Sequence, residues 1–91
     1  MQEVLKINYD GEDIVSKPFD FEAMCLINDV QYKNPQAGQL RMCKNAVSYM
    51  FEGTKVTDNV LNSLSIQKMT SLCMKLWKIY IEVLVEISKN E

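Results

Sequence analysis

The first part of the chain alternates apolar and polar residues, which predicts a β-hairpin over residues 3–19. Apolar side chains occupy every second position from Leu5 to Tyr9, the period of two that is typical of a half-buried strand. Asp10-Gly11 follows, and this pair favours a type I′ turn because both central positions need positive φ. A two-stranded hairpin alone is barely stable in water, so we expect it to lie on a helix or to pair its edge with another chain.

Helical spacing replaces this alternation after Asp20, whose carboxylate suits the N-cap position. We expect a first helix over about 21–32 and a second over about 39–51. A short third helix is expected over 58–61, capped by Thr57. The apolar positions are Phe21, Met24, Cys25, Ile27 and Val30 in the first helix and Leu40, Cys43, Ala46, Val47 and Met50 in the second.

The strongest pattern lies between Met69 and Ile87, where 13 of 19 residues are apolar. It predicts a long final helix with Ser65 as its N-cap. A surface helix of a small domain usually carries an apolar stripe only a little over 100° wide. This helix has the reverse proportion and needs burial on several sides at once. Its polar residues form one narrow stripe, which consists of Ser71, Lys75, Lys78, Glu82, Glu86 and Lys89.

Two interpretations of the final helix remain open. It is either the central strut of the domain, or a partly uncovered surface for a partner or a second copy. The earlier helices span about half of its expected length of about 35 Å, so we expect part of it to stay uncovered. The residues expected to mediate protein binding or self-association are Met69, Leu72, Leu76, Trp77, Tyr80, Val83, Leu84 and Ile87.

Length and composition indicate one α+β domain over 1–91, with the hairpin at about 3–19 and the helical body at about 20–89. Ninety-one residues allow a single core. We expect the hairpin to be followed by a bundle of three or four helices that ends in the long helix. The first residues lack the pattern of a signal peptide, and we expect no segment that spans a membrane.

The available residue types exclude most catalytic and ligand-binding chemistry. The chain has no histidine, which removes Ser-His and Cys-His nucleophile pairs and the commonest zinc ligand. Cys25, Cys43 and Cys73 form no Cys-x-x-Cys pair, and their apolar surroundings predict small buried hydrophobes. A net charge of −2 gives no general attraction to nucleic acid or anionic membranes. We therefore expect a protein that is not an enzyme, holds no cofactor or metal, and binds no small-molecule substrate, nucleic acid or membrane.

Several short motifs follow one another along the chain in a recognisable order. The hairpin sequence over 5–12 has Asp-Gly at its turn, and Phe-Asp-Phe-Glu-Ala over 19–23 opens the first helix. The segment 47–53, a connection containing Thr and Asp, and the long final helix follow. Over nearly the whole chain this layout resembles the small tail assembly chaperones of long, non-contractile-tailed bacteriophages.

The resemblance implies a non-enzymatic protein of the host cytoplasm. Members of the family bind the tape-measure protein, which is long, apolar and helical, and keep it in solution until tail-tube subunits polymerise around it. We expect a homo-oligomer, or a partner bound through the final helix in a helix-in-groove contact. The alternative is a small dimeric transcription regulator or antitoxin-like protein that dimerises through the same helix. A basic face would favour the regulator, and the sequence shows none.

Overall fold

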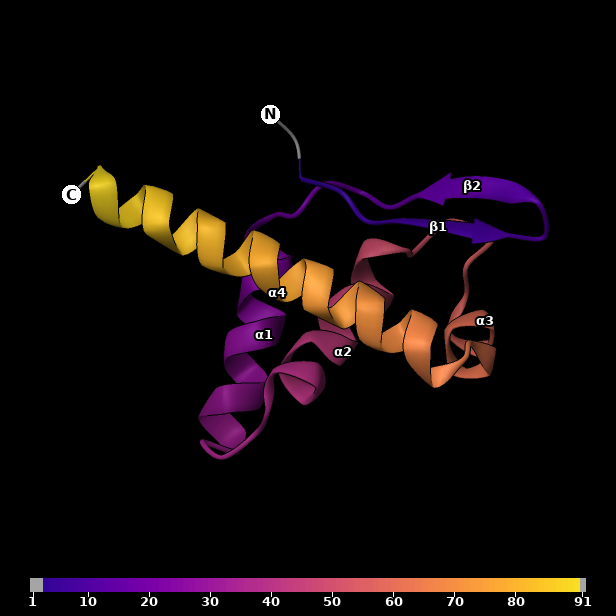
Figure 1. Ribbon diagram of the computed structural model, residues 1–91. Helices are drawn as coiled ribbons and strands as arrows, with labels where there is room; N and C mark the ends of the chain where they lie inside the picture. The colour runs from indigo at the N-terminus through magenta and orange to yellow at the C-terminus, as the bar shows by residue number, and fades with distance from the viewer. Residues whose placement is uncertain (1–2, 91) are drawn as a thin grey trace.

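An antiparallel hairpin precedes four helices in residues 3–90, the part of the chain that the computed structural model describes (Figure 1). The elements are β1 (Lys6–Tyr9), β2 (Glu12–Val15), α1 (Phe21–Lys33), α2 (Gln39–Met50), α3 (Asp58–Ser63) and α4 (Ile66–Lys89). The α+β architecture and the long C-terminal helix predicted from the sequence are confirmed.

The turn of the hairpin has the backbone conformation that its sequence predicts. Asp10 has φ 55° and Gly11 has φ 78°, as a type I′ turn requires. The resulting register places Ile7 opposite Ile14. Both side chains are buried, so one face of the hairpin joins the core while the other face is open to solvent.

Hydrogen bonds join the two ends of the hairpin to each other, and one bond connects them to the end of α2. The backbone N–H of Leu5 donates to Ser16 Oγ at 2.8 Å, and this hydroxyl donates to the carbonyl of Lys17 at 2.8 Å. The N–H of Lys17 in turn donates to the carbonyl of Met50 at 2.9 Å. The segment after β2 is therefore tied to the C-terminal end of α2, and the buried Ile7 and Ile14 of the hairpin belong to the hydrophobic core.

The start of α1 corrects one expectation about its apolar face. Asp20 caps the helix, since its Oδ1 accepts from the N–H of Ala23 at 2.9 Å. Phe21 is 78% exposed, whereas Ala23 and Ile27 are fully buried. The buried face is thus set by steps of four from Ala23. Phe21 lies two residues before Ala23, about 200° around the helix, and cannot reach the core.

The later caps also match the sequence. Thr57 Oγ1 accepts from the N–H of Val60 at 3.4 Å at the start of α3, and Ser65 Oγ accepts from the N–H of Lys68 at 3.1 Å at the start of α4. Helix α3 continues to Ser63, two residues beyond the predicted end. Only the residues Leu64 and Ser65 separate α3 from α4, which fixes the two helices close together.

Helix α2 lies at the centre of the helical body and packs against both α1 and α4. Figure 1 shows α4 crossing α1 and α2, with its C-terminal turns extending past them. Tyr80 on α4 donates a 2.6 Å hydrogen bond to Asn28 Oδ1 on α1, which pins this crossing. The buried residues of α2 and α4 are Met42, Cys43, Ala46, Val47, Met50, Leu72, Cys73, Leu76, Ile79 and Tyr80.

Candidate protein-binding surface

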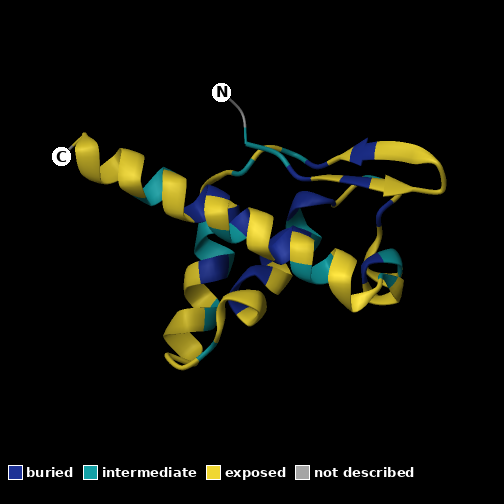
Figure 2. Ribbon diagram, in the orientation of Figure 1, coloured by how far each residue is buried: buried dark blue, intermediate teal, exposed yellow. Residues whose placement is uncertain are grey.

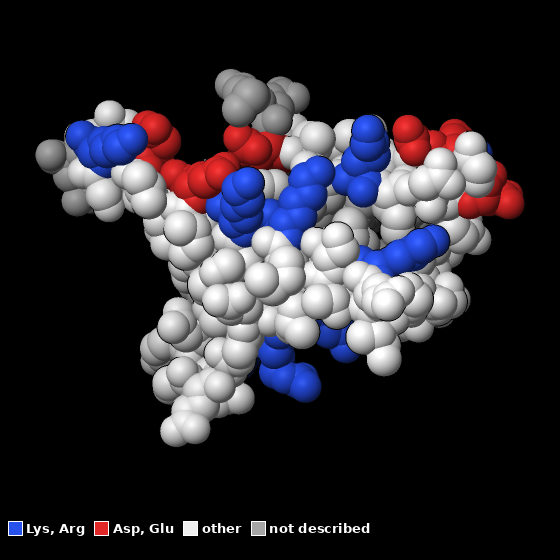
Figure 3. Space-filling model, viewed as in Figure 1, with Lys and Arg blue, Asp and Glu red and all other residues white. Residues whose placement is uncertain are grey.

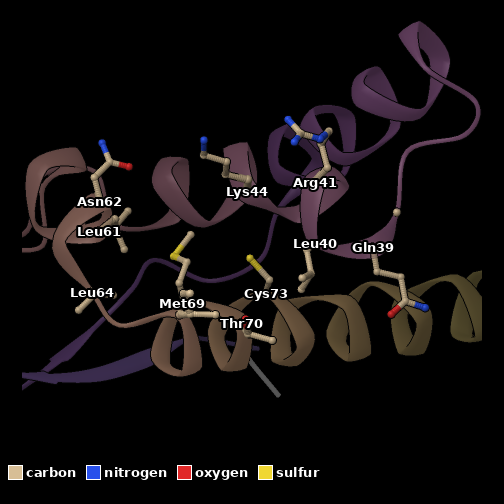
Figure 4. Close-up of a pocket in the computed structure, with 12 residues that line it drawn as sticks. Gln39, Leu40, Arg41, Lys44, Leu61, Asn62, Leu64, Met69, Thr70 and Cys73 are labelled. Carbon is tan, nitrogen blue, oxygen red and sulfur yellow. The ribbon is translucent and has the colours of Figure 1, made fainter.

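An open groove lies between the start of α2, helix α3 and the first half of α4 (Figure 4). Its volume is about 690 Å³. The short connection between α3 and α4 holds one end of the groove, and the N-terminal turn of α2 forms the other. The lining residues are Gly38, Gln39, Leu40, Arg41, Lys44, Leu61, Asn62, Leu64, Ile66, Met69, Thr70 and Cys73.

Apolar side chains dominate the floor and one edge of this groove. Figure 4 shows Leu40, Met69 and Cys73 in the space between α2 and α4. Leu40 is 45% exposed and Ile66 is 85% exposed. The sequence placed Leu40 on the apolar face of its helix, and the structure leaves it at the margin of the core. A partner that covered these side chains would remove apolar surface from water, which favours association.

The charge around the groove is positive. Arg41 and Lys44 both lie on α2 at its border, and no lining residue within the described chain carries a carboxylate. Both basic side chains belong to exposed residues. The groove therefore favours a ligand whose apolar surface is flanked by acidic groups.

The thiols near the groove are not prepared for nucleophilic chemistry. Burial raises the pKa of Cys43 to about 12, and the neighbouring Cys73 adds to the increase. Burial also raises the pKa of Cys73, although Lys44 acts in the opposite direction. With these raised pKa values, both thiols are protonated at neutral pH. They are therefore unreactive, because a thiol is a nucleophile only as the thiolate. Cys25 differs from the expectation because it is only partly buried.

The most developed polar network outside the groove has a structural role. Asp20 Oδ2 accepts a 2.6 Å hydrogen bond from the Tyr49 hydroxyl, while its Oδ1 caps α1. This bond lowers the pKa of the Asp20 carboxyl and raises the pKa of Tyr49 to about 12. The ammonium of Lys17 lies 3.7 Å from the centre of the Tyr49 ring. Through its two carboxylate oxygens Asp20 caps α1 and joins that helix to Tyr49 of α2.

The structure divides the eight residues selected on the final helix into three groups. Leu72, Leu76 and Tyr80 are buried within the chain itself. Met69 is half-buried and lines the groove. The remaining four lie toward the C-terminal end of the helix: Trp77, Val83 and Leu84 are half-buried, and Ile87 is 44% exposed.

The second half of α4 is the least covered part of the helix. Among residues 81–90 none is buried (Figure 2). Met74, Ile81 and Val85 are 45%, 39% and 48% exposed, and the sequence analysis did not select them. Their spacing in the sequence, seven residues and then four, could have identified them, because it aligns them on one side of a helix. Each of them directly precedes a charged residue of the polar stripe.

Metal-binding groups, membrane-spanning helices and similarity to known proteins were the remaining possible indications of function. Within residues 3–90, no group of three or more His, Cys, Asp or Glu side chains is placed to hold a metal ion. No helix in that range combines the length and the apolar character needed to cross a bilayer. Comparisons with protein-family models, with curated proteins and with solved structures give no match to this chain.

Proposed function

We propose that this chain is a non-enzymatic tail assembly chaperone of a long, non-contractile-tailed bacteriophage. It binds the tape-measure protein in the host cytoplasm and keeps that apolar, helical protein in solution before the tail tube forms. The observation that carries the proposal is the open apolar groove with a basic border between α2, α3 and α4. The family resemblance of the hairpin and of the Phe-Asp-Phe helix start supports the choice of partner.

The shape of the groove suits one helix of a partner. An amphipathic helix binds such a surface through apolar anchors at positions i, i+3 or i+4, and i+7. Leu40 of α2 and Ile66 of α4 offer exposed apolar contacts in the lining of the groove. Met69 lines the same groove, and its flexible side chain adapts to anchors of different shape. A surface of this kind fits many similar apolar helices along one long protein.

The charges predict the composition of the bound segments. Arg41 and Lys44 border the groove and meet no acidic lining residue. A tape-measure helix that binds here therefore carries Asp or Glu beside its apolar stripe. Exposed pairs of this kind contribute little affinity each, so they orient the helix, while burial of apolar surface supplies most of the binding energy.

Co-expression with the tape-measure protein from the same genome tests the proposal. The measurement is the fraction of tape-measure protein that stays in the supernatant after centrifugation and co-purifies with the chaperone. Leu40→Asp and Ile66→Asp introduce a charge at exposed groove positions and should reduce this fraction about tenfold. Tyr32→Asp is the matched control, because Tyr32 is 89% exposed on α1 and does not line the groove.

The outcomes are distinct. The proposal requires that the wild-type chain and Tyr32→Asp hold the tape-measure protein in solution while both groove variants fail. It is wrong if the wild-type chain neither binds the tape-measure protein nor raises its soluble fraction. It is also wrong if the groove variants perform as well as the wild type, because binding would then use another surface.

A further inference from the structure

The outward face of α4 carries an apolar stripe that no other part of the described chain covers. Met74, Ile81 and Val85 are each between 39% and 48% exposed. They lie on the side opposite Leu72 and Leu76, which are buried in the core. The stripe continues past the body of the protein, because the C-terminal turns of α4 extend beyond α1 and α2 (Figure 1).

A charged stripe runs beside the apolar one, and its sign changes along the helix. Lys75 and Lys78 occupy its first half, Glu82 and Glu86 follow them, and Lys89 ends the stripe. All five residues are exposed. Figure 3 shows basic side chains along the middle of α4, acidic side chains further along the helix, and a basic side chain at its C-terminal end. Within residues 3–90, the ion pair found on this helix is the long contact of 4.0 Å between Lys89 and Glu86.

We propose that α4 binds a second copy of this chain as an antiparallel helix pair, with the two-fold axis close to Ile81. An antiparallel copy places the acidic half of one charged stripe opposite the basic half of the other. Lys75 then faces Glu86 of the second copy, and Lys78 faces Glu82 of the second copy. Two-fold symmetry repeats each pair, so the interface holds four complementary pairs beside its apolar stripe.

The apolar flank of the helix, on the side away from the charges, favours the same antiparallel alignment. Trp77 and Leu84 are half-buried on the side of the apolar stripe away from the charges. In the antiparallel pair Trp77 faces Leu84 of the second copy, which brings apolar flank against apolar flank. A parallel pair would instead set the charged flank of one copy against the apolar flank of the other. The helices overlap over roughly 18 residues, or about 27 Å.

Two shallow hollows border the stripe. One hollow of about 550 Å³ lies on the charged side, where Met74, Lys75 and Ile79 line it together with Glu3 of the N-terminal segment. A second hollow of about 430 Å³ is lined by Ile81, Leu84 and Val85 among others. This surface is separate from the groove that we assign to the tape-measure protein, so a dimer leaves two grooves open.

Light scattering after size exclusion, over a range of concentrations, measures the association of the isolated chain. The wild type should form a dimer, and Glu86→Lys should raise its dissociation constant about tenfold because lysine then faces lysine in two places. The combined change Lys75→Glu with Glu86→Lys should restore dimerisation. Asp29→Lys on α1 changes the net charge equally at another exposed position and should have no effect.

Disulfide formation tests the orientation in a Cys25→Ser background, since Cys43 and Cys73 are buried. Near the axis, Ile81→Cys lies within about 1.5 Å, along the helix, of its copy and should form a disulfide readily. Val85→Cys lies about 14 Å from its copy and should not. Circular dichroism checks that each exposed variant keeps its helix content.

A monomer at all concentrations would overturn the proposal. So would equal effects of Glu86→Lys and Asp29→Lys, or equal disulfide yields at the two cysteine positions. These measurements use the chain alone. Their failure would therefore leave the binding of the tape-measure protein untouched, and the failure of that binding would leave the dimer untouched.

Discussion

Replacing Leu76 by alanine tests whether the middle of α4 is the centre of the core. The Leu76 side chain has no exposed surface, and it lies on the helix that crosses α2. The change removes three carbons from an enclosed site and leaves a cavity, because the surrounding helices relax only in part. Leu40→Ala makes the same chemical change on a side chain that is 45% exposed.

The expected magnitudes differ clearly. Removing a fully buried leucine side chain costs about 3 kcal/mol of the free energy of unfolding. In a domain of this size, that loss lowers the melting temperature by about 15 °C. Leu40→Ala loses only part of its transfer free energy and should cost less than about 1 kcal/mol.

Urea denaturation followed by circular dichroism measures both losses. The experiment is done at low protein concentration, because self-association would add stability to the folded state. If the free energy of unfolding falls with urea concentration at the same slope in the wild type and in both variants, the losses reflect stability. Equal, small losses for Leu76→Ala and Leu40→Ala would refute the packing of α4 against α2 described above.

Three smaller predictions concern single groups. Tyr80→Phe should cost about 1 kcal/mol of unfolding free energy through loss of its bond to Asn28, and no loss in denaturation would contradict that contact. The pKa of the Asp20 carboxyl is lowered by Tyr49, so its stabilising effect is complete above about pH 5 and is lost as the pH falls through the lowered pKa. Asp20→Asn should flatten this acid dependence in urea titrations, and an unchanged dependence would argue against the pair. Cys43 should resist a thiol reagent at pH 8 until the protein is unfolded, because burial raises its pKa; rapid labelling of the folded chain would show otherwise.

Local sequence signals predicted the elements well. Asp10-Gly11 specifies a turn by backbone conformation alone, and both residues have the expected positive φ. Ser65 specifies the start of α4 through a contact three residues away. These features depend on neighbouring residues, so the sequence contains the whole of the information that determines them.

The division of α4 into buried and exposed parts could not be predicted in the same way. Leu76 and Val85 are both apolar residues of one long helix, yet one is fully buried and the other is 48% exposed. The difference depends on where α1 and α2 cross the helix, which is a matter of tertiary packing. The groove has the same origin, because Leu40 and Ile66 come from separate helices that the fold brings together.

The position of α4 at the end of the element order affects how the protein folds during synthesis. Helix α4 packs against α2, and Cys73 of α4 neighbours Cys43 of α2. Until the ribosome has made α4, this side of α2 has no such cover. A nascent chain that contains only the first three helices therefore exposes apolar surface and is prone to aggregation. Conditions that delay the appearance of α4 should therefore lower the yield of folded chain, whatever the stability of the finished fold.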